Sequence, residues 1–237
     1  MIRECFATVR EGDETEGRRV GPADVPDKLV QRLIRIFASD EGYALYPDVT
    51  SFFERLNRLK YSGTMRGRVA GRKEEFDSIV VGILSNSDDR VAPILTSLGL
   101  QVGSAWADDG QLLSPMGAAT KGTVRYDIDF IVTSYEAGHE KPNRAIYEVA
   151  EKRAMEHLLA TTLGGSHVAD RGSWSHVHIG DEYGQDYRGA VEAGWDSYLL
   201  LRRDETANSQ KNQGMPPDVK QIHTLDELFP QLGLNKP

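Results

Sequence analysis

Three features are scarce in this 237-residue chain, and each scarcity excludes a class of protein. Cys5 is the single cysteine, so no disulfide can form within the chain, and a reducing compartment, cytoplasmic or nuclear, is expected. Long apolar runs are missing, since none approaches the ~20 residues that span a bilayer, and the N-terminus does not resemble a secretory signal. Positive charge is in deficit, with a net charge of −8. We therefore expect neither a membrane nor a nucleic-acid partner.

The rest of the composition is typical of a globular protein. Hydrophobic residues make up 39% and charged residues 27% of the chain, and the length allows one or two domains with a sizeable core. The first part of the chain predicts only helices, because apolar side chains recur at helical spacing over 2–9, 29–37 and 49–59. The stretch Tyr61–Lys73 is polar, contains glycine and carries a basic run, so it predicts a solvated loop.

From residue 79 onward, strand patterns alternate with helix patterns. The first apolar run is continuous, which is typical of a strand covered on both faces. The alternation predicts an α/β fold with a parallel sheet and helices on both faces. Ligands of such sheets bind beyond the C-terminal ends of the strands. The four predicted strands are Ile79–Leu84, Ile128–Thr133, Val177–Ile179 and Tyr198–Leu201. The intervening helices are predicted near 91–98, after Pro142 and over 190–194, and a capping box, Thr224–Glu227, opens a terminal helix.

Polar residues follow the first predicted strand. Ser85 and Asn86 stand where this strand gives way to a helix. A hydroxyl beside free backbone N–H groups can bind a phosphate oxygen there. The same pair can equally be a helix cap, so the Ser-Asn pattern alone leaves both interpretations open.

Charged residues follow two other strands. Lys141 precedes Pro142, where it can neutralise a phosphoryl group as a mobile point charge or lie at the surface. Asp181 and Asp186 follow the third strand in the segment Gly180-Asp-Glu-Tyr-Gly-Gln-Asp. Carboxylates at this spacing can hold Mg²⁺, which takes one or two carboxylates together with water and substrate phosphate. The alternative is a plain turn with a capping Asp.

Taken in order, these groups resemble motifs two, three and four of the haloacid dehalogenase superfamily, and in particular its eukaryotic haloacid-dehalogenase-like hydrolases. The resemblance covers roughly residues 26–202. It implies a Rossmann-like core with a helical cap, Mg²⁺ as cofactor and phosphoryl transfer through an aspartyl-phosphate. It also implies that Ser85 and Asn86 bind the phosphoryl group, that Lys141 stabilises the developing charge, and that Asp181 and Asp186 hold Mg²⁺.

The first motif of that family has no counterpart before Ile79. That motif is an apolar strand ending in Asp-x-Asp, which supplies the nucleophile and the general acid–base. Asp127-Ile-Asp129 has this spacing, but it follows motif two and begins a strand, so we do not expect it to supply the nucleophile. In the family the first strand lies between the strands that here end at Ser85 and Ile179. Without it, those two must pair directly or expose unpaired edges. We therefore expect a partial helical cap over 1–45 and a core over 46–237 that lacks its first strand.

Three functions fit this pattern. The first is a Mg²⁺-dependent phosphatase-type hydrolase that in its complete form acts on a small phosphorylated metabolite, the given chain being a truncated and inactive product or gene model. The second is a non-catalytic descendant that keeps the fold as a binding or regulatory module. The third is a dehalogenase that attacks carbon, which also needs the absent Asp.

Other residues are weaker candidates for a functional role. His176 and His178 lie two apart on a strand and hence on one face, but two histidines are too few for a structural zinc site, and we expect them to pack. Nothing around Cys5 suggests an activated thiol. We expect the three tryptophans, Trp106, Trp174 and Trp195, to be packing or loop residues.

Overall fold

The computed structural model describes residues 26–61, 65–69, 72–76, 78–103, 125–161, 174–202 and 214–234. The predictions made for the helix over 2–9, for Cys5 and for Trp106 lie outside these ranges. No helix within them is long and apolar enough to cross a membrane. The boundary at residue 45 between a partial cap and the core stays a prediction.

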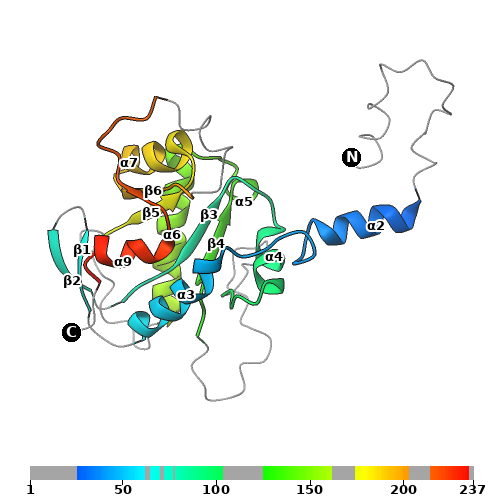
Figure 1. Cartoon of the computed structure of the whole chain (residues 1–237), viewed down its shortest axis with the longest axis horizontal. Helices are drawn as coiled ribbons and strands as arrows, with labels where there is room; N and C mark the ends of the chain where they lie inside the picture. Colours follow the sequence, from blue (N-terminus) through cyan, green and yellow to red (C-terminus); the bar gives the residue numbers. More distant parts are fainter. Residues whose placement is uncertain are drawn as a thin grey trace.

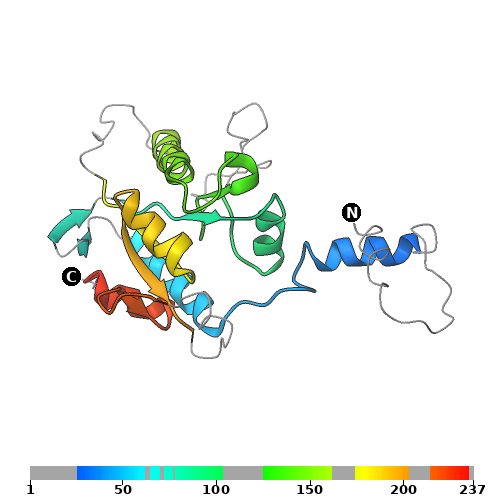
Figure 2. The same cartoon turned by 90° about the horizontal axis from the view of Figure 1, so that it is seen from above.

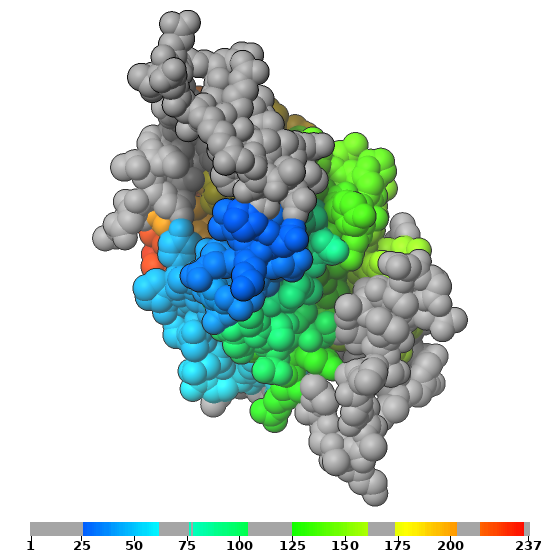
Figure 3. Space-filling model, turned by 90° about the vertical axis from the view of Figure 1, so that its right-hand side faces the viewer, coloured from blue at the N-terminus to red at the C-terminus, as the bar shows by residue number. Residues whose placement is uncertain are grey.

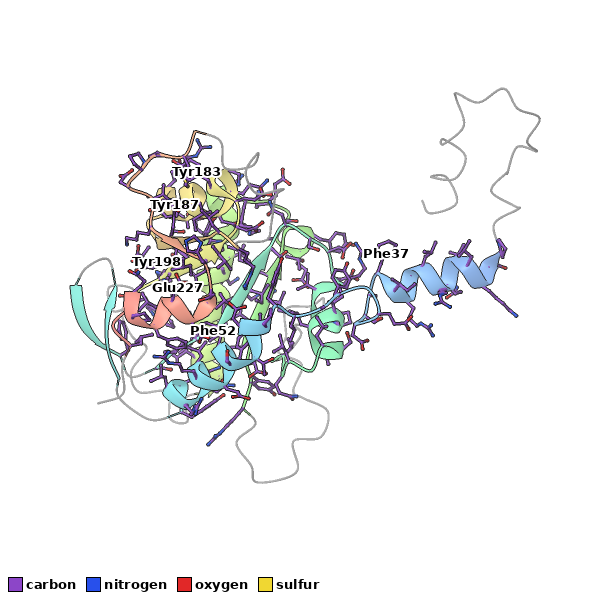
Figure 4. All side chains as sticks on the ribbon, in the orientation of Figure 1. Phe37, Phe52, Tyr183, Tyr187, Tyr198 and Glu227 are labelled. Atoms are coloured by element: carbon purple, nitrogen blue, oxygen red, sulfur yellow. The ribbon has the colours of Figure 1, made fainter. Side chains whose placement is uncertain are left out.

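Helix α2 (Asp27–Ile36) projects from the body of the molecule (Figure 1), and in the view of Figure 3 it lies in front of the body. Pro26 precedes its first turn, as the sequence predicts, and none of its residues is buried. Leu29 and Ile34 on its apolar stripe are 40% and 48% exposed. Figure 4 shows Phe37 at the end of α2 that joins the body.

Helix α3 (Pro47–Lys60) carries the third apolar stripe of the sequence and buries it. Pro47 begins the helix, where its missing N–H costs nothing. The rings of Phe52 and Phe229 lie with their centroids 5.4 Å apart, which joins α3 to the C-terminal helix. The buried side chains of α3 are Val49, Phe52, Phe53, Leu56 and Leu59.

The main strands form parallel sheets, as predicted. Strand β3 (Gly82–Ser85) pairs with β4 (Phe130–Thr133). A second sheet has the order β5 (Val177–Gly180), β6 (Asp196–Leu200), β7 (Gln221–Ile222), of which β7 was not predicted. The Rossmann-like α/β class, with parallel strands and flanking helices, is thereby confirmed.

The predicted single sheet is divided in two between β3 and β5. Among the described strands, β3 is hydrogen-bonded to β4 and β5 to β6, so each keeps one edge without a strand partner. Of the two outcomes expected for a core without its first strand, the exposed edge is the one found. The run Ile79–Leu84 is covered on both faces, as expected, because its side chains pack alternately on the two core clusters; each is nevertheless only half-buried, and Gly82 is exposed. By contrast, β4 and the middle of β6 are buried.

Two helices cover opposite faces of the β3–β4 sheet (Figure 2). Helix α6 (Arg144–Thr161) packs on β3 and β4. Its Ile146 and Tyr147 form one buried cluster with Phe130 and Val132. Helix α3 belongs to the other cluster, which takes in side chains of β3–β4 and of β5–β6, including Ile83, Ile131, Ile179 and Tyr198.

Polar contacts also tie α3 to both sheets. At its C-terminal end, the Lys60 ammonium lies 2.5 and 2.6 Å from the two carboxylate oxygens of Asp129, just before β4. At its N-terminal end, the Asp48 carboxylate accepts hydrogen bonds from Arg202 Nη1 at 2.8 Å and from the N–H of Leu225 at 2.7 Å. These partners follow β6 and β7. Helix α3 therefore spans the division between the sheets.

Several local predictions need correction. The loop predicted over Tyr61–Lys73 is wrong, because the chain forms there an antiparallel hairpin of β1 (Met65–Val69) and β2 (Arg72–Phe76). The helix after β3 starts later than the Ser-Asn pair, with no side-chain cap. The remaining elements are α4 (Val91–Ser97), α5 (Ser134–Ala137), the π-helical segment η3 (Tyr183–Arg188), α7 (Gly189–Glu192), the 3₁₀ turn η4 (Leu225–Glu227) and α9 (Leu228–Gln231).

Candidate functional site

The polar residues predicted at the strand ends converge on one end of the two sheets. Ser85 is the last residue of β3, Lys141 lies in the turn before α6, and Asp186 lies in η3, after β5. The Lys141 ammonium lies 3.0 Å from the carbonyl oxygen of Leu84 and 2.6 Å from Oδ1 of Asp186. One lysine side chain thus joins the end of the β3–β4 sheet to the segment that follows the other sheet.

Asp186 is the most enclosed group of this site, with 4% of its surface exposed. Its Oδ1 accepts from Lys141 and from Nε2 of His178 at 3.1 Å, and its Oδ2 accepts from the N–H of Glu182 at 2.9 Å. Burial alone would raise the pKa of Asp186, but the hydrogen bond from His178 and the Lys141 ammonium outweigh this and hold that pKa well below its usual value. Asp186 is therefore a carboxylate anion at neutral pH.

Glycine at position 180 makes room for this carboxylate. A Cβ at Gly180 would lie 2.1 Å from Cγ and 2.4 Å from Oδ2 of Asp186, far inside van der Waals contact. The segment after β5 can fold back over the strand end because no side chain stands there. The η3 segment begins at Tyr183, whose ring stacks on that of Tyr187 with centroids 5.9 Å apart (Figure 4).

His178 is a site residue that the sequence interpretation missed. It was expected only to pack, but it bonds Asp186 while its ring meets Tyr147 edge-on at 5.7 Å. The Tyr147 hydroxyl in turn donates to the carbonyl oxygen of Gln185 at 2.9 Å. The available signal was spacing: His178 and Gly180 lie on one face of β5, and Asp186 packs on that face.

The side-chain amide of Asn86 forms its hydrogen bonds with other residues of the protein. Its Oδ1 accepts from the N–H of Lys141 at 2.7 Å, and its Nδ2 donates to the carbonyl oxygen of Lys141 at 3.0 Å and to Oε1 of Gln185 at 2.8 Å. Beside Asn86 a cavity of about 650 Å³ opens to solvent. Its walls come from the segments that follow β3 and β4, including Arg90, Tyr135 and His139.

The two predicted metal ligands are placed differently. Asp181 is exposed, whereas Asp186 is buried against Lys141 and His178. Within the described ranges, no group of three or more His, Cys, Asp or Glu is arranged to hold a metal ion. Because Asp186 already accepts from protein donors, Mg²⁺ would fit these residues through the exposed Asp181 carboxylate more readily than through Asp186.

Asp129 belongs to a separate buried network at the opposite end of the strands. Its carboxylate also accepts from the N–H of Val81 at 2.8 Å, and Nε2 of His157 lies 3.4 Å away. Burial lowers the pKa of His157. Since Asp129 precedes β4, it lies far from the strand end where a nucleophile would be needed.

The second histidine of the pair, His176, does pack, as predicted. Its ring stacks on Trp195 with centroids 4.9 Å apart and on Trp174 at 6.2 Å. Trp195 donates its indole N–H to Glu151 at 2.9 Å. Through Trp195 this stack also meets the rings of Tyr147 and His178 edge-on, with centroids 5.3 and 6.5 Å away.

Comparisons with known proteins give a consistent set of relatives. No protein-family profile matches the chain. Haloacid dehalogenase-like hydrolase domain-containing protein 3 of Danio rerio is 27% identical over 209 residues, covering 88% of this chain and 61% of that protein. The protein of the same name in Mus musculus is 27% identical over 155 residues, covering 65% of this chain and 45% of that protein.

A further relative comes from yeast. A putative uncharacterized hydrolase of Schizosaccharomyces pombe is 23% identical over 176 residues, covering 74% of this chain and 55% of that protein. The chain spans about half the length of the curated relatives it matches. Among solved structures, a HAD phosphatase from Thermococcus onnurineus superposes with a TM-score of 0.47 at 18% identity, covering 81% of this chain and 60% of that one.

Proposed function

We propose the following function from the premise that this chain belongs to the haloacid dehalogenase-like hydrolase superfamily. The chain is the phosphoryl-binding core of a Mg²⁺-dependent hydrolase of phosphatase type. Its ligand is a small phosphorylated metabolite in the cytoplasm or nucleus, and neither nucleic acid nor membrane is a partner. The residues described here bind the phosphoryl group but do not by themselves hydrolyse its ester.

One observation carries the proposal, the position of the Lys141 ammonium. It lies 3.0 Å from the carbonyl oxygen of Leu84, the residue before Ser85, at the C-terminal end of β3. A cation and a hydroxyl at one strand end match the charge and the acceptor atoms of a phosphate group. The ion pair with Asp186 holds the cation there, with 10% of the lysine side chain exposed.

The proposal that the chain does not turn over substrate rests on the carboxylates near Lys141. Attack on phosphorus in this family needs a carboxylate beside the lysine. In the described part of the chain, the carboxylate beside Lys141 is that of Asp186. Its oxygens already accept hydrogen bonds from Lys141, His178 and the N–H of Glu182, so Asp186 is not placed to attack phosphorus. A strand added between the open edges of β3 and β5 would bring a carboxylate at its C-terminal end to Lys141.

Mg²⁺ would be held by Asp181, with water and phosphate oxygens as its other ligands. When bound, the ion would offset the negative charge of the phosphoryl group. Asp186 would act beside it by keeping Lys141 in place. Because Asp186 already accepts from protein donors, we expect weak Mg²⁺ binding that phosphate strengthens.

Calorimetric titration with inorganic phosphate, in the presence and absence of Mg²⁺, tests the binding step. Lys141→Met should weaken phosphate binding about tenfold or more, because a charge-assisted hydrogen bond is lost. The control is Lys152→Met, since Lys152 is 77% exposed on α6 and should leave binding unchanged. Failure of the wild-type chain to bind phosphate, or equal effects of both substitutions, would refute the proposal.

A second candidate function is a non-catalytic binding or regulatory module, and the closed Lys141–Asp186 pair favours it. The two candidates separate in a variant extended upstream by an apolar strand that ends in Asp-x-Asp. With p-nitrophenyl phosphate and Mg²⁺, a hydrolase core should gain activity that an Asn in place of the first added Asp abolishes. A folded, phosphate-binding extended variant without turnover would leave the binding module as the function.

A further inference from the structure

We infer that Asn86 is a positioning residue for Lys141 and not itself a ligand of the phosphoryl group, an inference whose functional part rests on the proposed function. Asn86 stands next to Ser85 in the motif and would be expected to bind phosphate with it. Its contacts indicate another task, because both of its amide donors already have protein acceptors, the carbonyl oxygen of Lys141 and Oε1 of Gln185.

The contact with Lys141 is a two-point grip on the backbone. Asn86 Oδ1 accepts from the N–H of Lys141 at 2.7 Å, while Nδ2 donates to the carbonyl oxygen of the same residue at 3.0 Å. Two bonds from one planar amide to the N–H and C=O of one residue fix both the place and the rotation of that residue. The direction in which the Lys141 side chain leaves the backbone is therefore set by Asn86.

A third bond connects this grip to the carboxylate that Lys141 pairs with. Asn86 Nδ2 donates to Gln185 Oε1 at 2.8 Å, and Gln185 directly precedes Asp186. The Tyr147 hydroxyl holds the same segment through the carbonyl oxygen of Gln185. Asn86 thus hydrogen-bonds both Lys141, which supplies the ammonium, and Gln185, the neighbour of Asp186 in the chain. Contact between Asn86 and a phosphate oxygen would require one of these bonds to break.

Chemical labelling of lysines tests the positioning role without any ligand. The Lys141 and Lys60 side chains are 10% and 8% exposed and ion-paired, whereas Lys152 is 77% exposed. We expect brief acetylation followed by peptide mass spectrometry to modify Lys152 readily and the other two slowly. Asn86→Ala should speed modification of Lys141 about tenfold, because the two hydrogen bonds that hold the Lys141 backbone are lost, and should leave Lys60 protected.

Lys60 separates positioning from unfolding, because it sits in the buried network at the other end of the strands. Equal acceleration at Lys60 and Lys141 would show a general loss of structure and overturn the inference. So would an unchanged rate at Lys141. Gln185→Ala removes one of the three bonds of Asn86 and should give a smaller, still selective, increase. It provides the same test if the Asn86 variant does not fold.

A double-mutant cycle on phosphate affinity tests how Asn86 acts. If Asn86 acts through Lys141, Asn86→Ala should weaken phosphate binding in the wild type and have almost no further effect in Lys141→Met. Additive losses would identify Asn86 as a direct ligand and overturn the inference. If the wild-type chain binds no phosphate, the proposed function fails, and the labelling result alone decides whether Asn86 positions Lys141.

Discussion

The buried pair between Lys60 and Asp129 gives the sharpest stability prediction. Both side chains are enclosed, at 8% and 2% exposed, and the ammonium lies 2.5 Å from the nearer carboxylate oxygen. Lys60→Met keeps the apolar stem of the side chain and removes its charge. Asp129 is then left as a buried anion whose nearest remaining donors are the N–H of Val81 and His157.

The expected loss follows from this geometry. Removing one partner of a buried ion pair costs about 3–5 kcal/mol, because the remaining charge stays desolvated. The N–H of Val81 still stabilises Asp129, so we expect Lys60→Met to lower the free energy of unfolding by about 3 kcal/mol. That is a large fraction of the roughly 5–15 kcal/mol that stabilises a typical domain.

Urea unfolding, followed by tryptophan fluorescence, measures this loss. Asp129→Asn in the Lys60→Met background should recover about 1–2 kcal/mol, since the orphaned charge disappears while an acceptor for Val81 remains. Lys152→Met is the matched control on the exposed Lys152–Glu156 pair, at 3.8 Å, and should cost less than about 1 kcal/mol. A loss for Lys60→Met no larger than that control, or no recovery in the double variant, would refute the argument.

Two further predictions concern the Asp186 site. Gly180→Ala should lower stability by about 1–3 kcal/mol, because its Cβ would overlap the Asp186 carboxylate, whereas Gly184→Ala, with open space around it, should be close to neutral in thermal denaturation. Asp186 has a lowered pKa when folded, so the stability it contributes is present above its unfolded pKa of about 4 and is lost as pH falls through the lowered folded value. Asp186→Asn should therefore flatten the decline of the urea midpoint below about pH 4, and an unchanged decline would contradict the assignment.

The sequence predicted those helices and strands whose buried faces appear as a regular pattern of apolar residues. The apolar stripe of α3 and the apolar runs of β4, β5 and β6 all appear close to their predicted places. The hairpin of β1 and β2 was missed because its strands, Met-Arg-Gly-Arg-Val and Arg-Lys-Glu-Glu-Phe, lack apolar alternation. An apolar run does not specify the strand with which it pairs. The sequence therefore left two outcomes open for β3 and β5, direct pairing with each other or unpaired edges.

The sequence placed Lys141 and Asp186 at neighbouring strand ends, but it predicted neither their direct contact nor the part of His178. Parallel strand ends lie at one edge of a sheet, which is why Lys141 and the end of β3 could be expected to meet. The bonds of Asp186 to Lys141 and His178 depend on the return of the chain through η3 over Gly180. A π-helical turn is rare and has no sequence pattern from which that return could be predicted.

Helix α3 determines how the molecule should come apart. Its C-terminal end bonds the β3–β4 sheet and its N-terminal end bonds the segments after β6 and β7, while its apolar face shares one cluster with both. When α3 detaches, the two sheets lose the larger of the two clusters that join them, while the smaller cluster with Val132 and Ala190 and the Lys141–Asp186 pair remain. Amide hydrogen exchange should then show that detachment of α3 lowers the protection of amides in both sheets.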